Sequence, residues 1–270
     1  GERESLGEVI LKGRFFEALD RVNNVSLNED ERREILLRLL LLPSSIEGIK
    51  AFLDFVKNGI PFTIRRGDEV VRKQIFLFDF DDVDNNDFLV VKEFEVEENE
   101  RRRRFDLCLF VNGIPLVVIE TKSPFREEEK GTTWFDAYRD ILEYERDVPG
   151  VFKYVQFCVV SDGYETRYFP NYYAGDYSGS LWVWKSFYPF SEEEIKPLKV
   201  FPYLDSTIFG MLSKGNLLDL VKNFIFVKRY RDTYVKIIAR WMQFKAANLI
   251  VRRVVEERDK KLDLALARFG

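Results

Sequence analysis

Two apolar segments that flank an Asn-Gly pair constrain the fold of this chain more than any other feature. Residues 105–111 and 116–121 are rich in β-branched and other apolar residues, and Asn112-Gly113 between them is a strong signal for a hairpin turn. The hairpin also carries charge that a buried strand does not favour: Asp106, Glu120 and Lys122. It therefore predicts both part of a central sheet and a candidate site.

The segments around this hairpin predict an α/β fold with a mixed central β-sheet flanked by helices. A helical lead-in is expected over residues 1–60, the sheet core over 62–170, and a further C-terminal helical segment after residue 201. One helix, residues 133–146, separates two of the strands and suggests a crossover within a mixed sheet. The strands are expected at residues 73–80, 88–96, 105–111, 116–121, 154–160 and 166–169, and the C-terminal helices at 208–212, 217–226 and 233–266.

The absence of histidine limits the chemistry that the chain can perform. None of the 270 residues is histidine, which excludes Ser-His-Asp and Cys-His mechanisms and histidine-rich zinc sites. The net charge of −4 means that any contact with nucleic acid must be local. Cys108 and Cys158 lie in apolar runs and are expected to be buried, reduced thiols of a cytoplasmic protein. No apolar stretch predicts a membrane span.

Whether Asp106 lies beside Glu120 and Lys122 depends on the hairpin turn. Glu120 and Lys122 are two residues apart and share one face of their strand. A strict two-residue loop at Asn112-Gly113 places Asp106 on the opposite face. A three-residue loop with a left-handed Gly113 and a bulge shifts the register by one and brings all three together. A functional site therefore predicts a bulged turn.

Two carboxylates and a lysine at the edge of a sheet suit the hydrolysis of a phosphodiester. Asp106 and Glu120 offer the hard oxygen ligands that Mg²⁺ prefers, with Mn²⁺ as a substitute. The ion would orient or acidify a water molecule, and the compact charge of Lys122 would stabilise the transition state. The same spacing also fits a solvated strand end with a Glu120–Lys122 ion pair, so the pattern alone leaves both interpretations open.

The sequence around these residues resembles a known family. Asp106, followed by Val-Asn-Gly-Ile-Pro-Leu-Val-Val-Ile-Glu-Thr-Lys-Ser-Pro at residues 111–124, is similar to the PD-(D/E)xK nuclease core of the restriction (R) subunit of type I restriction-modification enzymes. The resemblance continues through residues 86–91, 147–154 and 161–169 and covers most of the chain. It implies a restriction-endonuclease-like fold and a Mg²⁺-dependent endonuclease that cleaves double-stranded DNA.

The resemblance also assigns roles to individual residues. It implies that Asp106 and Glu120 are metal ligands and that Lys122 is the catalytic lysine. Tyr144 matches the tyrosine of a Gln-x-x-x-Tyr motif implicated in DNA cleavage, and Gln243 matches a glutamine that reads adenine ahead of a DNA-translocating ATPase.

The family organisation extends these expectations beyond single residues. Residues 1–200 would be the nuclease domain, and 201–270 a helical linker and the start of the motor (ATPase) domain. The intact subunit would use ATP and work with modification and specificity subunits that recognise the DNA sequence.

The chain departs from the family pattern in three places. Asp140 stands where the motif has glutamine, Phe105 replaces the usual proline before the first aspartate, and the chain is expected to begin after a helix that carries an acidic residue in the family. These departures also fit a nuclease-fold interaction module that has lost activity. A stand-alone DNA repair or recombination nuclease with the same core is a third interpretation.

Further candidates have simpler structural explanations beside the functional ones. Arg103 and Arg104 in the run 101–104 are candidate contacts to DNA phosphates, but nearby glutamates at 97, 98 and 100 also fit a self-neutralising hairpin tip. Tyr144 fits a half-buried helix position as well as a DNA contact. Gln243 fits an amphipathic helix with Trp241 and Phe244 in the core.

Overall fold

The computed structural model describes residues 2–67, 69–123, 133–198 and 201–269 and has a five-stranded mixed sheet at its centre. The order is β3-β4-β5-β6-β7, and all neighbours are antiparallel except β5 and β6, which are parallel. The α/β fold with a mixed central sheet is therefore confirmed. The strands are β3 (Phe88–Glu98), β4 (Arg101–Val111), β5 (Ile114–Thr121), β6 (Phe157–Ser161) and β7 (Thr166–Phe169).

The β4–β5 hairpin has the register shift that a functional site requires, but at a different place from the one predicted. Its turn is a clean two-residue turn, since Val111 pairs with Ile114 and both Asn112 (φ 50°) and Gly113 (φ 75°) have positive φ. The prediction of a three-residue, bulged turn is wrong. The shift occurs further along, between Leu109 and Phe110, where the pairing skips one residue of β5.

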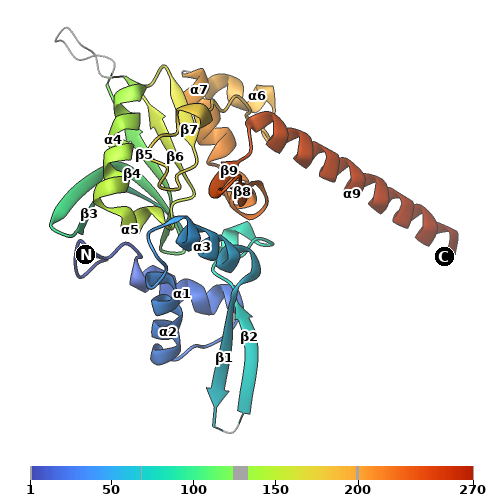
Figure 1. Cartoon of the computed structure of the whole chain (residues 1–270). Helices are drawn as coiled ribbons and strands as arrows, with labels where there is room; N and C mark the ends of the chain where they lie inside the picture. Colours follow the sequence, from blue (N-terminus) through green and yellow to red (C-terminus); the bar gives the residue numbers. More distant parts are fainter. Residues whose placement is uncertain (1, 68, 124–132, 199–200, 270) are drawn as a thin grey trace.

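Helix α4 (Trp134–Asp147) covers one face of the sheet (Figure 1) and makes the predicted crossover between β5 and β6. Its start is fixed by a capping box in which Thr133 and Asp136 bond each other's backbone N–H groups. The helix buries Ala137 and Ile141 against apolar side chains of the sheet. The short helix α5 (Pro149–Phe152) follows and leads into β6.

The opposite face of the sheet is covered by the N-terminal region and part of the C-terminal region. Helices α1 (Lys12–Asn23), α2 (Glu29–Leu40) and α3 (Ile46–Asn58) confirm the helical lead-in. A hairpin of β1 (Ile60–Arg66) and β2 (Glu69–Ile75) follows them as a separate sheet. Buried residues of these elements form one apolar cluster with side chains on the face of β4, β5 and β6 that is opposite to α4.

Two strand predictions near residues 60–80 are corrected. Strand β1 was missed, although Ile60, Phe62 and Ile64 alternate with exposed residues as in a half-buried strand. The strand expected at 73–80 ends at Ile75, because side chains rather than a neighbouring strand bond the following backbone. Asn112 Nδ2, for example, donates to the carbonyl oxygen of Leu77 at 2.9 Å.

The C-terminal region contains a β-hairpin that was expected to be helical. Strands β8 (Ile225–Tyr230) and β9 (Thr233–Ile238) pair through a tight turn in which Arg231 has a φ of 55°. Four β-branched residues in β9 favour an extended backbone over a helix. The α-helices that the structure describes here are α6 (Glu192–Ile195), α7 (Pro202–Asp205), α8 (Lys214–Asp219) and α9 (Trp241–Phe269). A short 3-10 helix η3 (Lys196–Leu198) and two π-helices, η4 (Ser206–Met211) and η5 (Leu220–Phe224), lie between them, so the helices expected at 208–212 and 217–226 are confirmed in part.

The long helix α9 projects away from the rest of the molecule (Figure 1), in agreement with the expected C-terminal helical segment. The domain division at residue 200 stays a prediction. Cys108 and Cys158 are free and fully buried, as expected. Among the described residues, no helix is long and apolar enough to cross a membrane.

Strand β9 carries a buried lysine that makes the stability of the fold depend on pH. Lys236 is 2% exposed, donates to the carbonyl oxygen of Val155 at 2.8 Å, and burial lowers its pKa to about 7. The unfolded chain therefore binds more protons than the folded chain above pH 7, and stability rises with pH. We expect the unfolding free energy to increase by about 1.5 kcal/mol between pH 7 and 8.5.

Urea unfolding of Lys236→Met across this pH range measures the effect, since the variant should lose the increase. Lys228→Met is the matched control, because Lys228 is an exposed lysine on the same hairpin. An equal pH response in wild type and Lys236→Met would contradict the assignment to Lys236.

Candidate active site

Asp106 and Glu120 come together where β4 and β5 run side by side. The pairing of Leu107 with Ile119 brings Asp106 opposite Glu120, which the bulge in the hairpin makes possible. The Asp106 carboxylate accepts hydrogen bonds from the backbone N–H (2.8 Å) and the hydroxyl (2.7 Å) of Thr121. These two bonds fix the carboxylate beside the end of β5.

Glu120 is a buried carboxylate with only long hydrogen bonds. Its side chain is 3% exposed, and it accepts from the Asp106 backbone N–H at 3.4 Å, the Tyr144 hydroxyl at 3.4 Å and Lys122 Nζ at 3.5 Å. Hydrogen bonds from charged donors to carboxylates are normally about 2.7–2.9 Å long. Burial, together with the negative charge of Asp106, raises the pKa of Glu120 to about 7.

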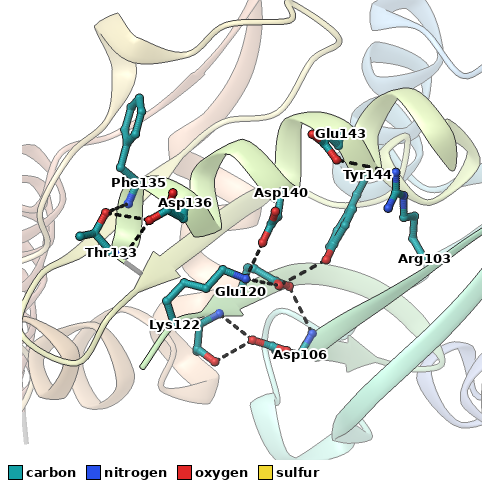
Figure 2. Close-up of polar contacts among 11 residues, drawn as sticks. Arg103, Asp106, Glu120, Lys122, Thr133, Phe135, Asp136, Asp140, Glu143 and Tyr144 are labelled. Carbon is teal, nitrogen blue, oxygen red and sulfur yellow. Dashed lines mark hydrogen bonds and ion pairs between the residues drawn. The ribbon is translucent and has the colours of Figure 1, made fainter. Parts of the chain in front are cut away.

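Lys122 lies between two carboxylates (Figure 2). Its ammonium forms a close ion pair with Asp140 on α4 and a longer contact, 3.5 Å, with Glu120. Burial opposes the charge, but the contacts with Asp140 and Glu120 outweigh it and raise the pKa of Lys122 above its ordinary value. The lysine is therefore a charged ammonium at the edge of the site.

Tyr144 packs beside the site, one helical turn after Asp140 (Figure 2). Its hydroxyl contacts Glu120, and its ring lies edge-on to Phe105 with 5.3 Å between ring centroids. Burial, and secondly the charge of Glu120, raises the pKa of Tyr144, so the hydroxyl stays protonated. Tyr144 is thus a half-buried helix residue, as its position on the helix predicted, and it also contacts Glu120, a candidate metal ligand.

The arginines of β4 are paired with acids, but not with those expected. Arg103 forms an ion pair with Asp147 and stacks over Tyr144, with 5.4 Å from its guanidinium carbon to the ring centroid. Arg104 is 59% exposed and lies 3.8 Å from Glu93. Arg101 pairs with Asp147 as well, and Arg102 with a glutamate of β3. Among the described residues, none of these arginines pairs with glutamates 97, 98 or 100.

A cavity of about 420 Å³ opens at this edge of the sheet. The described residues contain no cluster of three acidic, histidine or cysteine side chains suited to a metal ion. Two carboxylates nevertheless fit Mg²⁺, which keeps several waters and commonly uses one or two protein carboxylates beside a phosphate. The cavity is lined by Arg102, Arg103, Arg104, Asp106, Glu120, Thr121, Lys122, Ser123 and Tyr144.

The structure thus brings Asp106, Glu120, Lys122 and Tyr144 together and adds Asp140, whose role the sequence did not indicate. The position of Asp140, four residues before Tyr144, was the available signal, since that spacing puts both on one face of α4. Gln243 does not belong to this group. Its side chain accepts from the backbone N–H of Arg240 at the start of α9, while Phe244 is buried in the core.

Comparison with known proteins assigns the chain to a family. The family model described as the N terminus of the type I restriction enzyme R protein matches residues 1–176. The chain belongs to this family. The resemblance to the R subunit of type I restriction-modification enzymes, expected from the hairpin sequence, is therefore confirmed.

Similar relatives cover nearly the whole of this R-protein N-terminal chain. Two proteins of Methanocaldococcus jannaschii named as type I restriction enzyme endonuclease subunits, MjaIXP and MjaVIIIP, are each 31% identical to it over 94% and 96% of its length. The HindI endonuclease subunit of Haemophilus influenzae is 26% identical over 79%. The chain spans about a quarter of the length of the two Methanocaldococcus jannaschii relatives, 25% of MjaIXP and 24% of MjaVIIIP.

Proposed function

We propose that this chain is the nuclease domain of a type I restriction enzyme R subunit and hydrolyses phosphodiester bonds of double-stranded DNA with Mg²⁺, or Mn²⁺ in its place. One observation carries the proposal. Glu120 is a buried carboxylate with only long hydrogen bonds, next to a second carboxylate and a lysine. An ionised acid that is buried without short hydrogen bonds is costly in a folded protein, and either protonation, which the raised pKa of Glu120 reflects, or a bound cation relieves this cost.

Each side chain has a separate task in this proposal. Asp106 and Glu120 would hold the ion, which would supply an activated water and neutralise charge that develops on the phosphate. Thr121 fixes the Asp106 carboxylate through its N–H and hydroxyl. Lys122 would donate a hydrogen bond to the attacked phosphate and stabilise its negative charge. Tyr144 orients Glu120.

DNA would approach the cavity along β4. Arg104 is the better candidate contact, because it is more than half exposed and its neighbour Glu93 is 3.8 Å away. Arg103 is held by Asp147 and Tyr144 and would contact a phosphate only beside these partners. We propose that the intact R subunit, about four times as long as this chain in the relative MjaIXP, binds ATP with Gln243 near the adenine. We also propose that it works with the modification and specificity subunits.

The raised pKa of Glu120 gives the first test of this site. Metal binding requires ionised Glu120, and the pKa of about 7 means that the ion must displace a proton at lower pH. We expect the affinity for Mn²⁺ to rise by up to about tenfold per pH unit below pH 7 and to level off above it. Isothermal titration calorimetry of the chain from pH 5.5 to 8.5 measures this.

Glu120→Gln is the control, because its amide cannot titrate and should bind Mn²⁺ weakly at every pH. An affinity that stays constant below pH 7 in wild type, or an equal affinity in Glu120→Gln, would refute the role of Glu120.

A further inference from the structure

Asp140 is the closest partner of the candidate catalytic lysine. The Lys122 ammonium contacts Asp140 closely and Glu120 at 3.5 Å, so it lies between the two carboxylates. The acids differ in environment, since the Glu120 side chain is 3% exposed and that of Asp140 is 33% exposed. Figure 2 shows Asp140 reaching from α4 toward Lys122, on the other side of the ammonium from Asp106.

The helix that carries Asp140 is rigidly placed. Its first turn is fixed by the capping box of Thr133 and Asp136, and its inner face is fixed by fully buried Ala137 and Ile141. Tyr144, one turn further, contacts Glu120 from the same face. One stripe of α4 thus touches both Lys122 and Glu120, and Asp140 can hold the ammonium at a defined place.

Competition for Glu120 makes this contact important. Without Asp140, the nearest described carboxylate to Lys122 is Glu120, at 3.5 Å. An ammonium bound to Glu120 would compete directly with a divalent cation for the same oxygen atoms. Asp140 offers the lysine another anion at shorter distance, so the two cations need not share one carboxylate.

We propose that Asp140 is a positioning residue that holds the Lys122 ammonium away from Glu120 and leaves Glu120 available to the metal ion. The part of this inference that concerns the metal rests on the proposed function. Asp140 stands where the related motif has glutamine, and a neutral amide cannot form this ion pair. The substitution is then a change in how the lysine is held rather than a loss of function.

A double-mutant cycle tests the competition. Mn²⁺ affinity is measured by calorimetry for wild type, Asp140→Asn, Lys122→Met and the double variant. We expect Asp140→Asn to weaken Mn²⁺ binding about tenfold when Lys122 is present and less than about threefold when Lys122 is Met, since only the loss of a partly exposed charge remains. Equal losses in both backgrounds would overturn the proposal.

Glu143→Gln is the matched control for this cycle. Glu143 is another acid of α4, 49% exposed, and it lies 3.7 Å from Arg103 rather than near Lys122. Its replacement should change Mn²⁺ affinity less than about twofold in either background.

A metal-free measurement separates this proposal from the proposed function. In the Glu120→Gln background Asp140 is the remaining carboxylate partner of Lys122 among the described contacts. An ammonium held in an ion pair reacts slowly with an amine-acylating reagent, and mass spectrometry measures the rate at Lys122 with Lys12 as internal reference. Adding Asp140→Asn should increase this rate severalfold. An unchanged acylation rate at Lys122 would overturn the positioning role of Asp140, even if the wild type binds Mn²⁺ and cleaves DNA. An increased acylation rate, together with a wild type that does not bind Mn²⁺, would contradict only the proposed function.

Discussion

Replacing Lys122 with Met should lower cleavage of duplex DNA by about 10²–10³-fold while Mn²⁺ binding is retained. The ammonium lies 3.5 Å from Glu120 and lines the cavity beside Asp106, and a methionine side chain keeps the volume but cannot stabilise a developing phosphate charge. Removal of Lys122 also leaves Glu120 without a competing cation, so metal affinity should not fall. Plasmid nicking and linearisation with Mn²⁺, beside calorimetry, measure both quantities.

Lys12→Met serves as the control for the loss of a positive charge. Lys12 pairs with Glu8 in the N-terminal region and does not line the cavity of the candidate site. Cleavage by Lys122→Met at the wild-type rate would contradict the catalytic role, and a loss of Mn²⁺ affinity would show that the lysine supports the metal site instead.

Asn112→Ala should lower the unfolding free energy by about 4 kcal/mol. Asn112 is fully buried, and its Nδ2 donates to the carbonyl oxygen of Leu77 and to Asn86 Oδ1, both at 2.9 Å. Its Oδ1 accepts from the backbone N–H of Asp87 at 2.8 Å. Alanine would remove all three of these hydrogen bonds, although Asn86 Oδ1 would still accept from the Asp79 backbone N–H at 2.9 Å, and it would adopt the positive φ of 50° less easily.

Equilibrium unfolding in urea measures this loss. Asn58→Ala is the control, since the Asn58 side chain pairs with exposed Asp54 at the end of α3 and the substitution should cost less than about 1 kcal/mol. Equal stabilities of the two variants would contradict the central role of Asn112 in joining the hairpin to the 77–87 segment.

The sheet core could be predicted because local sequence and tertiary structure agree there. The Asn112-Gly113 turn and the apolar residues on both sides define a hairpin without help from the rest of the chain. The hairpin of β8 and β9 could not be predicted in this way. Its apolar positions fit a helix as well as a strand, and the pairing partner that decides between them is visible only in three dimensions.

The candidate site was predictable in its members but not in its geometry. The spacing of Glu120 and Lys122 gives a common face, yet the register that adds Asp106 depends on a bulge between Leu109 and Phe110. Pro115, which pairs with Phe110 beside the bulge, is a local signal for it but does not fix the register by itself. The role of Asp140 arises from the packing of α4 on the sheet, which is a long-range contact. Residue identity indicated this chemistry, whereas tertiary packing determines which groups meet.

Calorimetric titration of Mn²⁺ into wild type and Asp106→Asn, with a duplex oligonucleotide present, tests the central claim most directly. Asparagine keeps the size of the side chain and an acceptor for the Thr121 N–H and hydroxyl, but it removes one of the two ligand charges. The metal-site assignment predicts saturable binding by wild type and a loss of at least about tenfold in the variant. Equal affinity of both proteins, or no binding by wild type, would contradict it.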